Sequence, residues 1–257
     1  MNKSKNKNPA KYLLYRFNDL NITPQTAIIT GSGITLFGDK APLFEIKYSE
    51  IGKETKSKIK GHEGKLKVYR INKKEVLIFS GRSHLYQGLS FSEVTANVRL
   101  CHKLKVKKLI ITNAAGGINK DLKLGELMLI TGFIDLMQPT ERGILNGITQ
   151  PAFQIKSRLT NSLKNKLKTG IYAGVHGPSY ETYSEIKLLQ SLGANAVGMS
   201  TIPEIICAKS LEIDYAAISV ISNLWSKNHK PNHRNVLEQV KKANQKLSDL
   251  ILMLCNR

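Results

Sequence analysis

Three segments of this 257-residue sequence, 76–88, 109–117 and 194–204, share one pattern. In each, an apolar run of strand length is followed directly by polar residues of types that commonly bind ligands. In an open α/β sheet, ligands bind at the carboxyl ends of the strands. The segments therefore predict one crevice that holds an arginine, a histidine, hydroxyls and backbone amides. Such a set of groups suits a small anion together with a polar organic substrate.

The first segment carries the strongest signal for an anion site. Arg82, His84 and Tyr86 alternate after the strand expected over 76–79, so they would lie on one side of the chain. Arginine presents a planar fork of donors to an oxyanion, and histidine adds another donor. A surface arginine beside a satisfied histidine is the plainer interpretation, but three such residues on one side favour a binding site.

Two glycine-containing segments add weaker support. Ser32 stands between Gly31 and Gly33 after an expected strand, where the backbone can approach a ligand closely. Residues 113–117 form a small, flexible loop that could offer backbone N–H groups to an anion, although a close-packed turn fits the pattern equally well. Neither segment continues as a P-loop or a dinucleotide-binding fingerprint.

Glu181 and Asn223 are candidates for binding a planar heterocycle. A carboxylate accepts hydrogen bonds, an amide donates and accepts at once, and Tyr180 could stack on a ring. Each residue also has an ordinary interpretation, because Glu181 suits the first turn of a helix and Asn223 suits a turn. On the local pattern alone, the helix interpretation is favoured for Glu181.

Apolar strand-length segments alternate with amphipathic segments, which predicts an α/β fold with a central mixed, largely parallel β-sheet flanked by helices. We expect a disordered lead over residues 1–10 and a single domain over 11–257, with a loop at 132–152 that could cover a site. Capping-box spacing marks three helix starts, at Ser90/Glu93, Thr182/Glu185 and Thr201/Glu204. A helix from about residue 235 carries one apolar stripe of Val236, Val240, Ala243, Leu247, Leu250, Ile251 and Leu254.

The bulk composition excludes several classes of protein. No run approaches the ~20 apolar residues of a membrane helix, and the Lys/Asn-rich start does not resemble a secretory signal, so we expect a cytoplasmic protein. Lys and Arg number 39 against 19 Asp and Glu, a net charge of +20, but they are dispersed, so no nucleic-acid partner is expected. The three cysteines are far apart, and His, Asp and Glu lack ligand spacing, so neither a disulfide framework nor a metal site is expected.

Taken together, four motifs resemble those of the trimeric, low-molecular-mass purine nucleoside phosphorylases. They are GRxHxY, TNAAGG, GPSYET and VGMSTxPE, at residues 81–86, 112–117, 177–182 and 197–204. They are specific in combination, and the resemblance runs from about residue 25 to the C-terminus. It implies a nucleoside phosphorylase-like fold and a homotrimer. It also implies an activity in purine salvage, in which phosphate cleaves a purine nucleoside to the free base and ribose 1-phosphate without a metal or organic cofactor.

The resemblance also implies a role for individual residues. The expected phosphate ligands are Ser32, His62, Arg82, His84, Ala114 (through its amide) and Ser200. The expected ribose contacts are Tyr86, Met199 and His233. The expected base pocket is Tyr180, Glu181, Val197 and Asn223, and the groups expected in catalysis are Asn223, Glu181 and His84.

The residue type at position 223 indicates which purine base the protein prefers. Asn223 can donate to a 6-oxo group, whereas the related methylthioadenosine phosphorylases carry Asp there, so 6-oxopurine (deoxy)ribonucleosides such as inosine and guanosine are expected. Gln87 replaces the family's Glu, which predicts weaker support for Arg82, and the segments 138–153 and 224–232 are short. Phe153 is a candidate for the Phe that the family lends to a neighbouring subunit.

Three alternatives to this assignment stay open, and the departures motivate the first two. One is a phosphorylase for xanthosine or methylthioadenosine, and another is a non-catalytic purine- or phosphate-binding relative. The third, a basic nucleic-acid binder, is favoured least.

Overall fold

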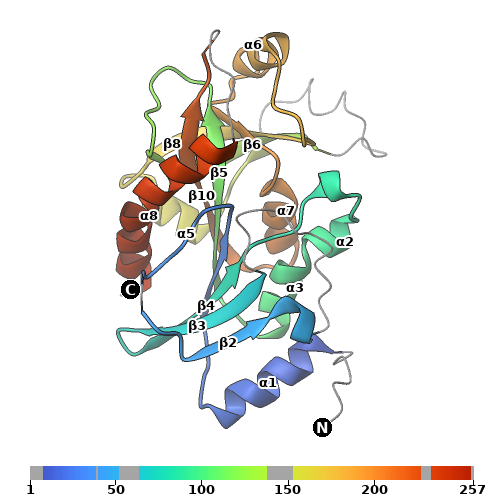
Figure 1. Ribbon diagram of the computed structural model, residues 1–257, viewed down its shortest axis with the longest axis vertical. Coiled ribbons are helices and arrows are strands. Elements are labelled where there is room, and N and C mark those ends of the chain that lie inside the picture. Colours follow the sequence, from blue (N-terminus) through green and yellow to red (C-terminus); the bar gives the residue numbers. More distant parts are fainter. Residues whose placement is uncertain (1–7, 39, 52–63, 138–152, 227–232, 256–257) are drawn as a thin grey trace.

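Strands and helices alternate along the chain in the computed structural model, which describes residues 8–38, 40–51, 64–137, 153–226 and 233–255 (Figure 1). The strands are β1 (Thr26–Thr30), β2 (Phe44–Lys47), β3 (Lys65–Ile71), β4 (Lys74–Ser80), β5 (Lys108–Gly117), β6 (Leu127–Leu136), β7 (Phe153–Gln154), β8 (Lys168–Val175), β9 (Ala196–Gly198) and β10 (Asp214–Leu224). The helices are α1 (Pro9–Asp19), α2 (Phe91–Val94), α3 (Ala96–Lys103), α5 (Arg158–Leu163), α6 (Tyr183–Ser191), α7 (Ile202–Ser210) and α8 (His233–Cys255), with short 3₁₀ turns η1 (Tyr48–Ile51) and η2 (Leu85–Gln87).

All the strands belong to one mixed sheet, in the order β10-β6-β8-β9-β5-β1-β4-β3-β2, with β7 beside β6. The pairs β1–β4, β1–β5, β5–β10, β6–β8 and β8–β9 are parallel, and the remaining pairs are antiparallel. Because β5 pairs with β10 as well as with β9, the strands β10, β6, β8, β9 and β5 close into a small barrel. The α/β class and the mixed sheet are as predicted, whereas the barrel closure was not foreseen.

The two faces of the sheet pack against different helices. In β1, Ala27 and Ile29 join a core cluster with residues of α1, α3 and α7, while Ile28 between them joins a cluster with α5 and α8. This alternation follows from the two-residue period of a strand. Figure 1 shows α5 and α8 on one side of the sheet and α2, α3 and α7 on the other. The whole predicted stripe of α8 is buried, so that prediction is confirmed.

Three element boundaries differ from the prediction. Helix α1 begins at Pro9, within the stretch 1–10 that was expected to be disordered, with Asn8 as its cap. Strand β6 runs on to Leu136, so residues 132–136 of the expected loop are strand, and 138–152 lies outside the described residues. Strand β5 continues through Gly117, because residues 112–117 pair with β10 instead of forming a loop.

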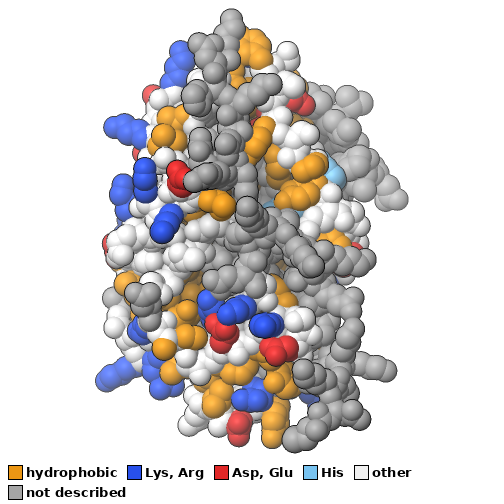
Figure 2. All heavy atoms as spheres, in the orientation of Figure 1, with side chains coloured by type: hydrophobic (Ala, Val, Ile, Leu, Met, Phe, Trp, Pro, Cys, Tyr) orange, Lys and Arg blue, Asp and Glu red, His pale blue; other side chains and the backbone are white. Residues whose placement is uncertain are grey.

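The surface agrees with the dispersed charge seen in the sequence. Figure 2 shows Lys and Arg side chains of one face scattered over its margin and lower part, with carboxylates beside several of them. None of the helices in the described ranges is both long and apolar enough to cross a membrane.

Candidate active site

A cavity lies where β1, β4, β5, β9 and β10 reach their carboxyl ends. The structure brings to it the predicted residues Ser32, Arg82, His84, Tyr86, Ala114, Tyr180, Glu181, Val197, Met199, Ser200 and Asn223. Two more predicted residues cannot be placed, because His62 and the side chain of His233 lie outside the described part of the chain. The crevice expected at the strand ends is therefore present.

The arrangement of β5 opens the sheet at this point. On one edge β5 pairs with β1 as far as Ile111, and β9 joins that edge only at Gly116. Between these pairings the described strands leave that edge of β5 without a neighbour, and residues 113–116 line the cavity there. Backbone of a strand edge therefore faces the cavity, where the sequence predicted a loop. Gly31 permits this approach, since a Cβ there would lie 2.9 Å from the Cα of Asn113.

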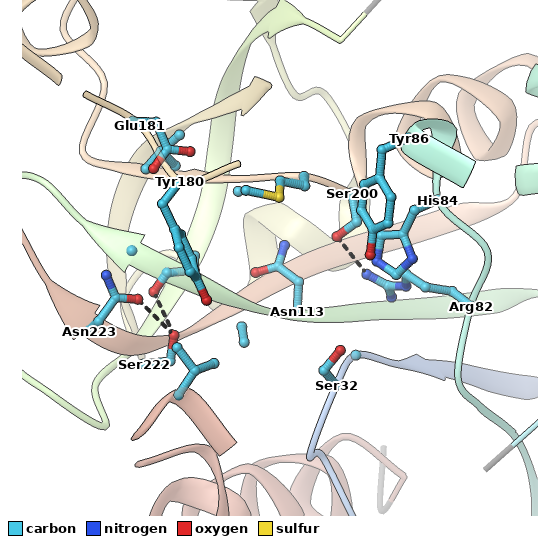
Figure 3. Close-up of a pocket in the computed structure, with 18 residues that line it drawn as sticks. Ser32, Arg82, His84, Tyr86, Asn113, Tyr180, Glu181, Ser200, Ser222 and Asn223 are labelled. Carbon is cyan, nitrogen blue, oxygen red and sulfur yellow. Dashed lines mark hydrogen bonds between the residues drawn. The ribbon is translucent and has the colours of Figure 1, made fainter. Parts of the chain in front are cut away.

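The cavity has two chemically different ends (Figure 3). Arg82, His84, Tyr86 and Ser200 lie at one end, which carries a guanidinium, an imidazole and hydroxyls. The opposite end carries a carboxylate, an amide, a phenol and a hydroxyl, from Tyr180, Glu181, Ser222 and Asn223, and Asn113 lies between the ends.

Arg82 is fixed in place by groups around it. The side chain is 1% exposed, and its Nε lies 3.4 Å from Oε1 of Glu204, which is 4% exposed. Its Nη1 donates to the hydroxyls of Ser200 (3.2 Å) and Thr201 (3.1 Å), and its Nη2 donates to the carbonyl of Ile29 (3.3 Å). A guanidinium held in this way is oriented before any anion binds, so binding an anion needs little rearrangement.

Glu204 and Thr201 were expected to form a capping box at the start of α7, and that prediction is wrong. The Thr201 side chain accepts no cap hydrogen bond from the backbone of α7, although the two other predicted boxes, on α2 and α6, are formed. Losing a cap costs about 1 kcal/mol, whereas a buried guanidinium without its carboxylate costs about 3–5 kcal/mol. The ion pair with Arg82 therefore decides where Glu204 lies.

His84 and Tyr86 reach the cavity by a route that the sequence did not predict. The extended backbone ends at His84 (φ −127°, ψ 151°), and the following 3₁₀ turn brings the Tyr86 ring onto the His84 ring, with centroids 4.8 Å apart. Gln87 accepts a hydrogen bond from the backbone N–H of His84 at 2.7 Å. The carboxylate that supports Arg82 comes from Glu204. The replacement of the family's Glu by Gln87 therefore does not leave Arg82 without support.

The opposite end presents Glu181 and Asn223. Burial raises the pKa of the Glu181 carboxyl above its usual value, and the charge of Glu185 adds to that rise. The Ser222 hydroxyl lies 3.2 Å from the Asn223 Oδ1, to which it can donate. Gly116 leaves room for this amide, since a Cβ at that position would lie 3.1 Å from the Asn223 Nδ2. These groups can accept from and donate to the edge of a flat heterocycle.

Sequence reasoning missed four residues that support or line the site: Asn113, Thr201, Glu204 and Ser222. Treating residues 112–117 as strand would have placed the Asn113 side chain on the same face as that of Ile111. Phe153, by contrast, is half exposed on β7, where its ring stacks on Phe133 at 5.4 Å and does not line this cavity.

Known proteins match both the sequence and the fold. The model of the phosphorylase superfamily matches residues 25–255. Purine nucleoside phosphorylase of Bos taurus is 34% identical over 90% of this chain and 88% of that protein. Purine nucleoside phosphorylase 1 of Geobacillus stearothermophilus is 33% identical over 87% of this chain and 86% of that protein.

A solved structure supports the same relationship. Schistosoma mansoni purine nucleoside phosphorylase in complex with inosine has a TM-score of 0.76 and 28% identity, covering 97% of this chain and 96% of that one. A crystal structure of the same schistosome protein in complex with adenosine has 29% identity and a TM-score of 0.76, covering the same shares of both chains. The chain therefore belongs to the phosphorylase superfamily and, within it, to the purine nucleoside phosphorylases.

Proposed function

We propose that the protein cleaves 6-oxopurine nucleosides, such as inosine, guanosine and their deoxy forms, with inorganic phosphate. The products are the free base and (deoxy)ribose 1-phosphate. The observation that carries this proposal is the cavity itself, in which a fixed cationic end faces a carboxylate–amide end. Two further findings support the proposal: the chain belongs to the phosphorylase superfamily, and a relative of known structure has been solved with inosine bound.

Phosphate binds at the cationic end in this proposal. Arg82, His84 and the hydroxyls of Ser32 and Ser200 donate to its oxygens, with the Ala114 amide and His62 as further ligands. Bound there, phosphate acts as nucleophile at the anomeric carbon and as counter-charge to the oxocarbenium character that develops on the ribose. Catalysis then comes mainly from positioning and from fixed electrostatics.

The base binds at the opposite end, and the ribose lies between the two. Asn223 forms hydrogen bonds with N7 and O6 of the purine, and the Glu181 carboxylate accepts from N1–H. These bonds stabilise the negative charge that the leaving base acquires. Tyr180 and Val197 flank the base, and Tyr86, Met199 and His233 contact the ribose. A site built to hydrogen-bond the 6-oxo group discriminates against a base that lacks it.

Steady-state assays test this assignment directly. We expect base release from inosine only when phosphate is present, and a lower rate with adenosine, because an amide donor faces position 6. The comparison of inosine with adenosine is informative because a schistosome relative has been solved in complex with adenosine. Faster cleavage of adenosine, xanthosine or methylthioadenosine would overturn the base assignment, and purine binding without any turnover would identify a non-catalytic relative.

Three further properties belong to the same proposal. We infer a homotrimer that acts in purine salvage in the cytoplasm, and a reaction that requires neither a metal nor an organic cofactor. Phe153 is half exposed and so could reach the site of a neighbouring copy in such a trimer. Light scattering of the purified protein tests the trimer, and an assay in the presence of a chelator tests the metal requirement.

Glu181 gives the site a pH dependence. Burial raises its pKa above the usual 4.5, so as the pH falls the carboxyl takes up a proton earlier than an exposed glutamate does. The protonated carboxyl donates where the base requires an acceptor, so we expect hypoxanthine affinity to be full near neutrality and to fall on acidification. Calorimetry without phosphate measures this, and Glu181→Gln should remove the pH dependence in the same range. A wild-type affinity that is constant down to the usual pKa of glutamate contradicts the prediction.

A further inference from the structure

Thr201 lies behind the cationic end, and the mechanism above gives it no part. It is 1% exposed and does not line the cavity. Its backbone has φ 76° and ψ −46°, a region that a β-branched residue rarely adopts and that persists only where the surroundings enforce it. Since the side chain does not cap α7, the cap does not explain this conformation.

The hydrogen bonds of the Thr201 hydroxyl determine where its proton points. A hydroxyl has two lone pairs and one proton. Thr201 Oγ1 accepts from Nδ2 of Asn113 at 2.7 Å and from Nη1 of Arg82 at 3.1 Å, which occupies both lone pairs. Among the described residues, the remaining hydrogen-bonding partner of this hydroxyl is Oγ of Ser200, at 3.1 Å. The Thr201 proton therefore goes to Ser200, which acts as the acceptor in this pair.

Counting the hydrogen bonds that the Ser200 hydroxyl accepts shows that its own proton points into the cavity. Its Oγ accepts from Thr201 and, at 3.2 Å, from Nη1 of Arg82, so both of its lone pairs are occupied as well. Its backbone groups are engaged separately with the Tyr172 hydroxyl. Ser200 lines the cavity at the cationic end (Figure 3). Its own proton is therefore left to point into the cavity.

We propose that Thr201 is a positioning residue that holds the Ser200 hydroxyl as a donor toward a bound oxyanion. Asn113 and Arg82 set the direction of Thr201, and Thr201 sets that of Ser200. Without Thr201, the Ser200 Oγ keeps only the bond from Arg82, so one of its lone pairs loses its donor. The hydroxyl can then turn that lone pair toward the anion, which repels it. The identity of the anion as phosphate rests on the proposed function, but the direction of the hydroxyl does not.

Two substitutions of Thr201 separate the effect of losing the hydroxyl from the effect of changing the shape of the side chain. Thr201→Val keeps the branched shape and removes both the acceptor and the proton, while Thr201→Ser keeps the hydroxyl. Thr201→Val should weaken the hydrogen bond from the Ser200 hydroxyl to the charged phosphate. We therefore expect phosphate affinity, measured by calorimetry, to fall about tenfold or more. We expect Thr201→Ser to retain most of the affinity, and the hypoxanthine affinity to be unchanged in both variants.

Either of two results with these single variants would overturn the proposal. One is wild-type phosphate affinity in Thr201→Val, and the other is an equal loss in the Ser and Val variants, since that would assign the effect to packing. Melting curves confirm that each variant is folded. If Thr201→Val does not fold, Thr201→Ala removes the same hydroxyl without a branched side chain.

A double-mutant cycle tests whether Thr201 acts through Ser200. In a Ser200→Ala background the hydroxyl that Thr201 orients is gone, so adding Thr201→Val should cost much less phosphate affinity than it costs in the wild type. An equal cost in both backgrounds means that Thr201 acts only through Arg82, and the proposal fails.

Calorimetry keeps this inference separate from the proposed function. A wild type that binds phosphate but releases no purine base with it contradicts the proposed function, and the calorimetric comparison still decides the role of Thr201. A wild type that does not bind phosphate overturns both.

Discussion

Arg82→Ala is expected to lower kcat/KM for phosphate by about 10²–10³-fold and to lower the free energy of unfolding by about 3–5 kcal/mol. The catalytic loss arises because the substitution removes the guanidinium, which supplies the charge and fixed donors for the phosphate at the cationic end. The loss of stability has a separate cause, since the substitution leaves the Glu204 carboxylate buried at 4% exposure without its cation. Steady-state kinetics with varied phosphate and urea unfolding measure the two effects independently.

Arg70→Ala is the matched control for this prediction. Arg70 also pairs with a glutamate, Glu75, at 3.0 Å, but its side chain is 49% exposed and lies outside the cavity. Exposed pairs contribute about 0–1 kcal/mol, so stability and activity should hardly change. A kcat/KM for phosphate that stays at the wild-type value in folded Arg82→Ala would show that the anion binds elsewhere.

Asn223→Asp is expected to reverse the preference for the base. A carboxylate accepts only, so it cannot donate to a 6-oxo group, but it can accept from a 6-amino group. Losing a transition-state hydrogen bond of this kind commonly costs about 10²-fold or more, so inosine cleavage should fall by that amount while adenosine cleavage rises relative to it. The measurement is the ratio of kcat/KM for the two nucleosides.

Asn161→Asp controls for the change of an amide to a carboxylate. Asn161 is exposed on α5 and does not line the cavity, so the ratio of inosine to adenosine cleavage should stay at the wild-type value. An unchanged ratio in Asn223→Asp would mean that another group selects the base. Tyr180, Glu181 and Ser222 would then be the residues to vary next.

The elements of the fold were largely predictable, because their signals are local. The alternation of strands and helices and the stripe of α8 both follow from hydrophobic periodicity. The closure of β5 onto β10 depends on pairings between residues far apart in the chain, which periodicity does not specify. The same pairings extend β5 through residues whose small size and glycines suggested a loop.

The candidate site shows the same division between local and distant interactions. Side chains that follow directly after a strand were found, because their position in the sequence fixes where they lie. Glu204 and Thr201 were misinterpreted because their spacing matches a capping box, and only the fold shows that Arg82 lies beside them. A buried charge from a distant segment outweighs a local preference worth about 1 kcal/mol.

The sugar product of inosine cleavage tests the central claim most directly. Phosphorus NMR of the purified protein with inosine and phosphate should show ribose 1-phosphate formed in equal amount to the hypoxanthine released. Cleavage that yields free ribose, or that proceeds at the same rate without phosphate, would contradict the account, because water would then be the nucleophile and the cationic end would not hold phosphate for the reaction.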